Sequence, residues 1–170
     1  TTGEGGMVLT NNKKLETNLK IYRDHGMSPE KKYVHVVKGF NYRMTNMQAA
    51  IGLGQLTRIN KILSKREEQN QNYKKLFSSL NHLNYRPNID WSESVHWLAT
   101  ITLENEKLRD PLIKYLYENG IEGRPMVYPI HMASPYKLEN KREKFPIANS
   151  ISLASLHLPS SLNITHDQQT

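Results

Sequence analysis

The chain has 170 residues, of which 23 are Lys or Arg and 16 are Asp or Glu, and it contains no cysteine. This length suits one domain, or one domain with part of another. The lack of cysteine excludes disulfide frameworks, thiolate zinc sites and cysteine nucleophiles. No run approaches the ~18 apolar residues of a membrane span. Thr1–Gly6 has neither the basic nor the apolar part of a signal peptide. These patterns predict a soluble, cytoplasmic protein without a membrane partner, and the non-methionine start predicts part of a longer gene product.

The net charge of +7 is distributed unevenly. Residues 1–50 hold eight basic and four acidic side chains, residues 51–100 hold seven and four, and residues 101–170 hold eight of each. A basic region of this kind indicates either a solvated surface or an anionic partner. Because the sequence has no arginine-rich tract and no RNA-binding aromatic motif, a phosphate-bearing small ligand is favoured over nucleic acid.

The first 44 residues predict a strand, a helix and a loop. The apolar run Met7–Leu9, between glycines and asparagines, predicts a short buried strand. Apolar residues spaced four and three apart predict a helix over 12–24, which His25-Gly26 ends because glycine accepts the left-handed conformation. Residues 26–44 are expected to form a loop.

The clearest helix start in the chain is a capping box made by Thr45 and Gln48. An apolar face continues from there and predicts a helix over about 45–80, which at 1.5 Å per residue is ~54 Å long. A helix of that length either bends or links two lobes. Gly52 and Gly54 weaken it, and they indicate either incidental tolerance or close approach by another group.

The second half predicts alternating strands and helices. A period of two gives a strand with one buried face, formed by Trp97, Ala99, Ile101 and Leu103. Asp110-Pro111 predicts a helix start, with Asp as N-cap and Pro at the first helical position, and Asn119-Gly120 predicts its end. The elements expected after it are a strand over 121–127, an irregular stretch over 128–145, a helix over 145–153, a strand over 156–159 and a single helical turn after Thr165.

Three segments concentrate polar groups that can meet a ligand: Thr1–Gly6, Gly39–Asn46, and Gly123–Pro125 with Tyr128–His131. The second segment directly precedes a helix N-terminus, where backbone N–H groups favour an anion. Each segment also has a structural interpretation. Asn41 can make a turn, Arg43 can pair with a surface carboxylate, and His131 can be a hydrogen-bonded surface residue. The seven histidines form no His-x-x-x-His pair, so no metal site is expected.

In order and spacing, these segments together resemble the DegT/DnrJ/StrS family of pyridoxal-phosphate-dependent (PLP-dependent) sugar aminotransferases. The resemblance spans nearly the whole chain, and its details are most similar to perosamine-synthase-like members, which act on nucleotide-linked 4-keto-6-deoxy sugars. The segments that carry it are Thr1–Val8, Arg23–Met27, Gly39–Ala50, Gly120–Pro125, Tyr128–His131 and Phe145–Pro159.

The resemblance implies an α/β fold, that of a fold type I PLP-dependent transferase. Residues 1–82 would form the end of the large PLP-binding domain, including the long connecting helix at about 45–80. Residues 83–170 would form the small C-terminal α/β domain, with its last helix truncated. The resemblance also implies a homodimer with the active site at the interface, a cofactor (pyridoxal 5'-phosphate) and an amino-acid donor, usually glutamate, for a nucleotide-linked ketosugar.

Four site residues follow from the resemblance. Asn41 matches the asparagine that reaches the cofactor phosphate across the dimer, and Arg43 would support that loop. His131 and Arg124 match positions near the sugar substrate or near the active-site loop of the dimer, and they are expected to bind the substrate. The Schiff-base lysine of the family lies a few residues before the segment that begins at Thr1, so the chain is expected to contain no catalytic residue and to be inactive alone.

Two other functions stay open at this point. The chain can be a non-catalytic dimerisation or complementing module of a split gene. It can also belong to a sugar dehydratase of the same fold, in which a histidine replaces the lysine.

Overall fold

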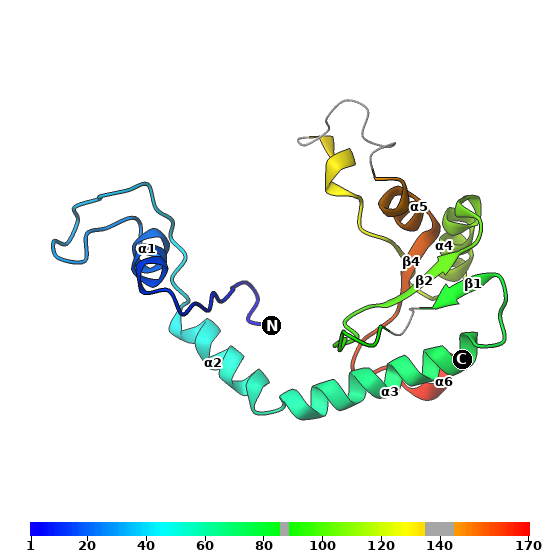
Figure 1. Ribbon diagram of the computed structural model, residues 1–170. Coiled ribbons are helices and arrows are strands. Elements are labelled where there is room, and N and C mark those ends of the chain that lie inside the picture. The colour runs from blue at the N-terminus through cyan, green and yellow to red at the C-terminus, as the bar shows by residue number, and fades with distance from the viewer. Residues whose placement is uncertain (86–88, 135–144) are drawn as a thin grey trace. The chain divides into compact units, whose positions relative to one another are not determined.

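The computed structural model describes residues 1–85, 89–134 and 145–170, and these divide into two compact units, Thr1–Ile59 and Asn60–Thr170 (Figure 1). Among the described residues, no helix is long and apolar enough to cross a bilayer. The division of a complete enzyme into domains at residues 82 and 83 stays a prediction.

The first unit consists of two helices and the loop between them. Helix α1 (Lys13–Arg23) is capped by Asn12, whose Oδ1 accepts from the Leu15 N–H at 3.1 Å, and it ends where His25 and Gly26 adopt φ of 59° and 71°. The helix predicted over 12–24 and its stop are therefore confirmed. The loop then folds back so tightly that a Cβ on Gly26 would lie 2.0 Å from the Val37 carbonyl oxygen, a contact that no side chain tolerates.

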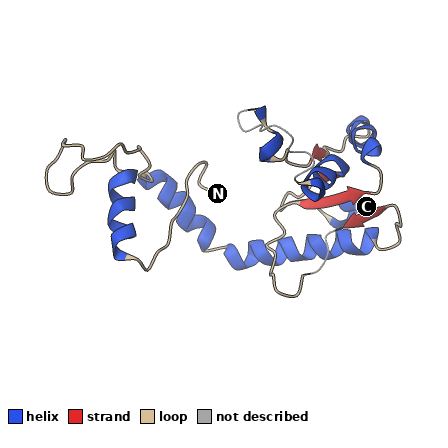
Figure 2. Cartoon of the chain, turned by 45° about the horizontal axis from the view of Figure 1, so that its top comes forward, coloured by secondary structure: helices blue, strands red, loops and turns tan. Residues whose placement is uncertain are grey.

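The strand predicted at Met7–Leu9 is wrong. These residues form no strand, and Figure 2 draws them as loop; their exposed fractions are 81%, 68% and 86%. A strand exists only when a neighbour satisfies its backbone N–H and C=O groups, and the described residues of this unit supply none. The expected burial of the apolar run is therefore wrong as well.

The single helix predicted over 45–80 is wrong in its continuity, because two helices occupy that range. Helix α2 (Asn46–Leu56) begins with the predicted capping box, and helix α3 (Ile59–Phe77) follows after a break at Thr57 and Arg58. The Thr57 hydroxyl donates to the Gly54 carbonyl oxygen at 3.0 Å. A hydrogen bond from a side chain to the backbone competes with the backbone hydrogen bonds of a helix. The nearby glycines weaken the helix further.

The two glycines of α2 differ. A Cβ on Gly52 would lie 3.2 Å from Thr2 Cγ2, whereas a Cβ on Gly54 would meet open space. Thr2 therefore approaches Gly52 closely, whereas none of the described residues packs against the Cβ position of Gly54.

The second unit is built on a four-stranded antiparallel sheet in the order β1-β2-β4-β3 (Figure 1). The strands are β1 (Leu83–Tyr85), β2 (Ala99–Leu103), β3 (Arg124–Pro125) and β4 (Ser155–Leu158). The helical elements are α3, η1 (Glu106–Leu108), α4 (Arg109–Glu118), η2 (Ile130–Met132), α5 (Pro146–Ala154) and α6 (His166–Gln169).

One face of this sheet forms the core. Leu156 of β4 is fully buried and lies opposite Ile101 of β2, with Leu103 beside them. The side chains that pack against this cluster are Phe77, Leu83, Tyr85, Leu112, Ile113, Leu116 and Leu158, which come from α3, β1, α4 and β4. The apolar stripe of α4 and the alternation in β2 therefore meet as their spacing predicts.

Several predictions for this unit are confirmed. Ala99, Ile101 and Leu103 form the buried face of β2, α4 ends at Asn119-Gly120, and β4 matches the strand predicted over 156–159. Helix α5 matches the helix predicted over 145–153, with its proline at the start, and α6 is a single turn capped by Thr165.

Other predictions for this unit are wrong. Trp97 is 68% exposed, because His96 before it has φ of 47° and the strand begins only at Ala99. Asp110 does not cap α4, which begins one residue earlier and continues directly from η1; Asp110 pairs instead with Arg109.

Of the strand predicted over 121–127, only Arg124–Pro125 form a strand, β3. Strand β1 was not predicted from the sequence. The irregular stretch predicted over 128–145 contains η2, and its residues 135–144 lie outside the described residues.

Candidate cofactor and substrate sites

The first two polar segments lie together in the first unit. The Gln48 side chain donates to the Glu4 carbonyl oxygen at 3.1 Å, and a Cβ on Gly5 would lie 2.9 Å from Thr2 Oγ1. Residues 1–7 and Met44 line a hollow of about 290 Å³. Segments about 40 residues apart in sequence thus form one surface, with the N-terminal glycines beside the start of α2.

Asn41 is fixed through its backbone. It forms an isolated antiparallel bridge with Asp24, and the neighbouring rings of Phe40 and Tyr42 stack with centroids 5.0 Å apart. The side chain of Asn41 is exposed. The turn interpretation is therefore compatible with the observed backbone, and the exposed amide can still donate to an external anion.

Arg43 makes the ion pair that the structural interpretation anticipated. Its Nη1 lies 3.6 Å from Asp24 Oδ2, and 66% of the Arg43 side chain is exposed. Exposed pairs of this kind contribute about 0–1 kcal/mol. Because the pair is long and exposed, the guanidinium can turn to a stronger anionic partner at small cost.

The N-terminus of α2 already satisfies part of its own backbone. The Gln48 N–H donates to Thr45 Oγ1 at 3.3 Å, and the Thr45 N–H donates to Gln48 Oε1 at 2.9 Å. These two donors are therefore engaged by the capping box, and an anion near this terminus would depend mainly on side chains such as Asn41 and Arg43.

In the second unit, His131 is held by α5. Its Nε2 lies 2.8 Å from Oδ1 of Asn149, and its ring centroid lies 4.6 Å from that of Phe145. His131 is half-buried, while Asn149 is only 3% exposed. The histidine is thus fixed by two residues rather than mobile at the surface.

Arg124 lies elsewhere in that unit. It is in β3, opposite His157 of β4, and its Nε and Nη2 donate to Oε1 of Glu122 at 3.0 and 2.9 Å. Its side chain is 72% exposed. Arg124 and His131 therefore have different partners, and the structure gives no direct bond between them in the described residues.

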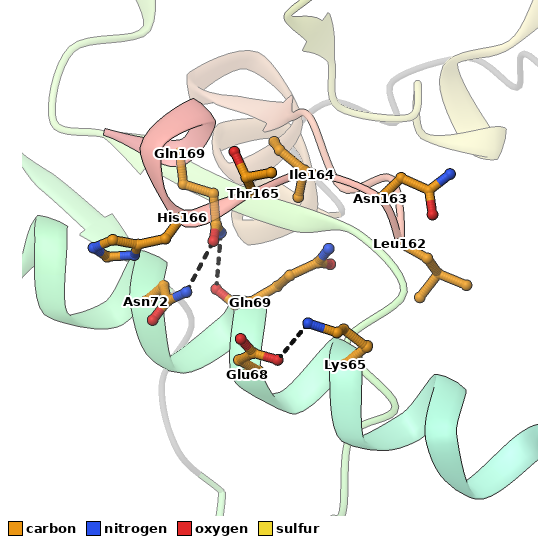
Figure 3. A pocket seen from close by; sticks show the side chains of 10 residues that line it. All are labelled: Lys65, Glu68, Gln69, Asn72, Leu162, Asn163, Ile164, Thr165, His166 and Gln169. Atoms are coloured by element: carbon orange, nitrogen blue, oxygen red, sulfur yellow. Dashed lines mark hydrogen bonds and ion pairs between the residues drawn. The ribbon is translucent and has the colours of Figure 1, made fainter.

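A second hollow has no counterpart among the sequence predictions. It measures about 430 Å³ and is lined by residues of α3 and by the segment that leads into α6 (Figure 3). Asn72 donates to the Gln169 side chain at 3.0 Å, and Gln169 donates to the Gln69 carbonyl oxygen at 3.2 Å. These bonds join α6 to α3, so the polar side chains that line the hollow hold the two helices together. No local pattern could predict bonds between residues almost 100 positions apart.

The solved structures that this chain matches include an aminotransferase and a putative sugar aminotransferase. The chain matches the Helicobacter pylori protein PseC, described as an aminotransferase involved in the biosynthesis of pseudoaminic acid, with a TM-score of 0.88 and 25% identity. The match covers 99% of this chain and 47% of that one. The PLP-form of a putative sugar aminotransferase from Streptococcus pneumoniae shares the fold at a TM-score of 0.85 and 21% identity, covering 99% of this chain and 45% of that one. The expected fold class, a fold type I PLP-dependent transferase, is confirmed.

The chain belongs to the DegT/DnrJ/EryC1/StrS aminotransferase family, whose model matches residues 1–170. It is similar to the GDP-perosamine synthase of Caulobacter vibrioides, with 37% identity over 97% of this chain and 45% of the relative. It is also similar to the GDP-perosamine synthase of Escherichia coli O157:H7, with 36% identity over 99% of this chain and 45% of that relative. The chain therefore spans about half the length of these relatives.

Proposed function

We propose that this chain is part of a PLP-dependent aminotransferase that moves an amino group from glutamate to a nucleotide-linked keto-deoxy sugar. The observation that carries the proposal is the similarity to GDP-perosamine synthases along almost the entire chain. The complete enzyme would act as a homodimer with its active site at the interface.

The residues of the first unit fit the phosphate end of the cofactor. Asn41 is exposed, Arg43 makes a weak ion pair with Asp24, and residues 1–59 hold nine basic against four acidic side chains. An amide and a guanidinium are both suitable donors to phosphate oxygens. In this proposal Asn41 reaches the phosphate across the dimer and Arg43 supports its loop. The bound cofactor supplies the electron sink for amino-group transfer.

The residues of the second unit would contact the sugar. Arg124 keeps 72% of its side chain exposed beside Glu122, so its guanidinium can meet a charged or hydroxylated ligand. Asn149 binds Nε2 of the His131 imidazole, and Nδ1 has no hydrogen-bond partner among the residues that the structure describes. In this proposal Nδ1 contacts the ligand. The role of both residues is to bind and orient the sugar rather than to move protons on the cofactor.

The chain alone would be inactive, because none of its lysines takes the place of the Schiff-base lysine. Lys13 and Lys14 follow the N-terminal glycines most closely; both are exposed on α1, and Lys13 pairs with Glu16 at 3.2 Å. To test this, the purified chain is mixed with PLP and divided into two portions. One portion is reduced with borohydride to trap any covalent cofactor, and the other is left unreduced and assayed with glutamate and a GDP-linked 4-keto-6-deoxy sugar. We expect neither covalent cofactor nor amino sugar. Retention of PLP on one lysine together with turnover would contradict the proposal.

A chimeric enzyme tests the activity itself. In the chimera, this chain replaces the matching 168-residue part of the Caulobacter enzyme. We expect PLP- and glutamate-dependent formation of the amino sugar. A chimera that folds and binds PLP but transfers no amino group would contradict the proposed function.

The Asn41→Ala variant of the chimera tests the phosphate contact. A lost hydrogen bond to a charged group is worth about 1.5–3 kcal/mol, so PLP affinity should fall about tenfold or more. Asn11→Ala is the matched control, because Asn11 is an exposed asparagine of the same unit that lies outside the proposed site. Equal PLP affinity in the two variants would remove Asn41 from the cofactor site.

A further inference from the structure

The buried face of α5 is polar, which is unusual for a short helix packed in an α/β unit. Its buried residues are Asn149, Ser152 and Ala154, at 3%, 5% and 6% exposure. Burying an amide or a hydroxyl costs free energy unless it is hydrogen-bonded. The bonds that these two side chains make therefore show what this face of the helix holds in place.

Both polar side chains bind the same neighbouring segment. Ser152 Oγ donates to the Val127 carbonyl oxygen at 3.1 Å, and Asn149 Oδ1 lies 2.8 Å from His131 Nε2. Asn149 and Ser152 are three residues apart, so they lie on one face of the helix. The backbone of residues 127–131 and the ring at its end are thus fixed by adjacent turns of α5.

The bond to Asn149 also determines where the proton of the imidazole lies. A carboxamide oxygen only accepts hydrogen bonds, so the nitrogen facing it, Nε2, carries the hydrogen. In the neutral ring the other nitrogen, Nδ1, then has an unshared pair. Phe145 lies against the ring at an interplanar angle of 40°, which limits its rotation.

We propose that Asn149 is a positioning residue: it holds His131 with Nε2 protonated, so that Nδ1 accepts a hydrogen bond from a ligand hydroxyl. The assignment of that hydroxyl to a sugar rests on the proposed function. The orientation of His131 by Asn149 does not, because it depends only on contacts within the second unit.

The orientation is tested by nitrogen NMR of the histidine side chains in the complete chain. At a pH where His131 is neutral, we expect Nε2 to be protonated, Nδ1 to be unprotonated, and the Hε2 proton to be visible because Asn149 slows its exchange. In Asn149→Ala the Hε2 signal should be lost to exchange with water. Asn149→Asp keeps an accepting oxygen and should retain the signal.

Ser152→Ala is the matched control. It removes a hydrogen bond of the same helix to the same segment without touching His131, so the Hε2 signal should remain. An unprotonated Nε2 in the unsubstituted chain would overturn the proposal even if the alanine variant fails to fold. An Hε2 signal that persists in a folded Asn149→Ala chain would overturn it as well.

The sugar contact is tested separately in the chimera with the GDP-linked ketosugar. Asn149→Ala should raise the KM for the sugar several-fold more than Ser152→Ala does, while the KM for glutamate stays unchanged. If the NMR result is as expected but the sugar KM of the two variants is equal, the sugar assignment fails. If the chimera has no transferase activity, the proposed function fails and the orientation of His131 stands on the NMR result.

Discussion

The two units of the chain differ in how they bury apolar side chains. In the second unit a small antiparallel sheet encloses Leu156, Ile101 and Leu103, and every buried hydrophobic residue of the described chain lies in this unit. In the first unit the single buried residue among those described is Gly26. The second unit therefore carries its own core, whereas the first exposes the apolar residues that its sequence provides.

Helix α2 shows the difference most clearly. Its apolar residues Met47, Ile51, Leu53 and Leu56 are between 49% and 79% exposed, and no residue of the helix is buried. A helix that is apolar on all sides is normally buried, and large exposed apolar patches mark contact surfaces. We expect other parts of the assembled aminotransferase to cover α2, which is consistent with a chain that spans about half the length of its relatives.

The largest expected effect comes from truncating the core of the second unit. Leu156 is fully buried, so Leu156→Ala should destabilise the chain by about 3 kcal/mol through lost burial and a residual cavity. Leu53→Ala is the matched change in the first unit, where the side chain is 65% exposed, and should stay within ~0.5 kcal/mol. Urea unfolding monitored by circular dichroism measures both. Similar losses for the two variants would contradict the comparison.

A smaller effect is expected at Tyr73, which packs between α3 and the sheet. Its hydroxyl donates to the Pro159 carbonyl oxygen at 2.7 Å, so Tyr73→Phe should cost about 1 kcal/mol at neutral pH. Burial raises the pKa of the Tyr73 phenol above its usual value. Because the pKa is higher in the folded state, the stabilisation is complete below the unfolded pKa of ~10 and is lost as the pH rises through the folded pKa.

Tyr73→Phe should therefore lose less stability than the unsubstituted chain when the pH is raised from neutral into the alkaline range. Urea unfolding at several pH values measures this slope. An identical alkaline loss in both chains would show that other groups cause it.

The effect at the cap of α2 is expected to stay within one helix. Thr45→Ala removes the hydroxyl that accepts from the Gln48 N–H, which weakens the start of the helix by about 1 kcal/mol. Because the first unit has no core of its own, this loss should appear as reduced helical circular dichroism without a shift in the urea midpoint of the second unit. A shift of that midpoint would show that the two units unfold together.

Local signals in the sequence predicted most of the elements correctly. The Thr45–Gln48 box, the glycine stop of α1 and the alternation in β2 each depend on residues within a few positions of one another. The prediction of a strand at Met7–Leu9 was wrong because a strand depends on a distant partner. The predicted burial of Trp97 was wrong because the chain turns at His96 before the strand begins.

The contacts that support the candidate site residues were not predictable from the sequence, and the roles of these residues stay predictions. The structure shows only that Asn41 is exposed and that Arg43 pairs with Asp24. The bond between His131 and Asn149 joins residues 18 positions apart on different elements. No periodicity or spacing predicts a contact of that kind, because it arises only when α5 packs against the segment that contains His131.

Hydrogen exchange of the backbone amides in the complete chain tests the comparison most directly. Core strands open only with global unfolding, whereas segments with few buried contacts open locally at a cost near zero. We expect the amides of β2 and β4 to be strongly protected and those of α2 to exchange almost as fast as in an unfolded peptide. Equal protection of α2 and the sheet would contradict the account, because it would show that the first unit is stable within this chain alone.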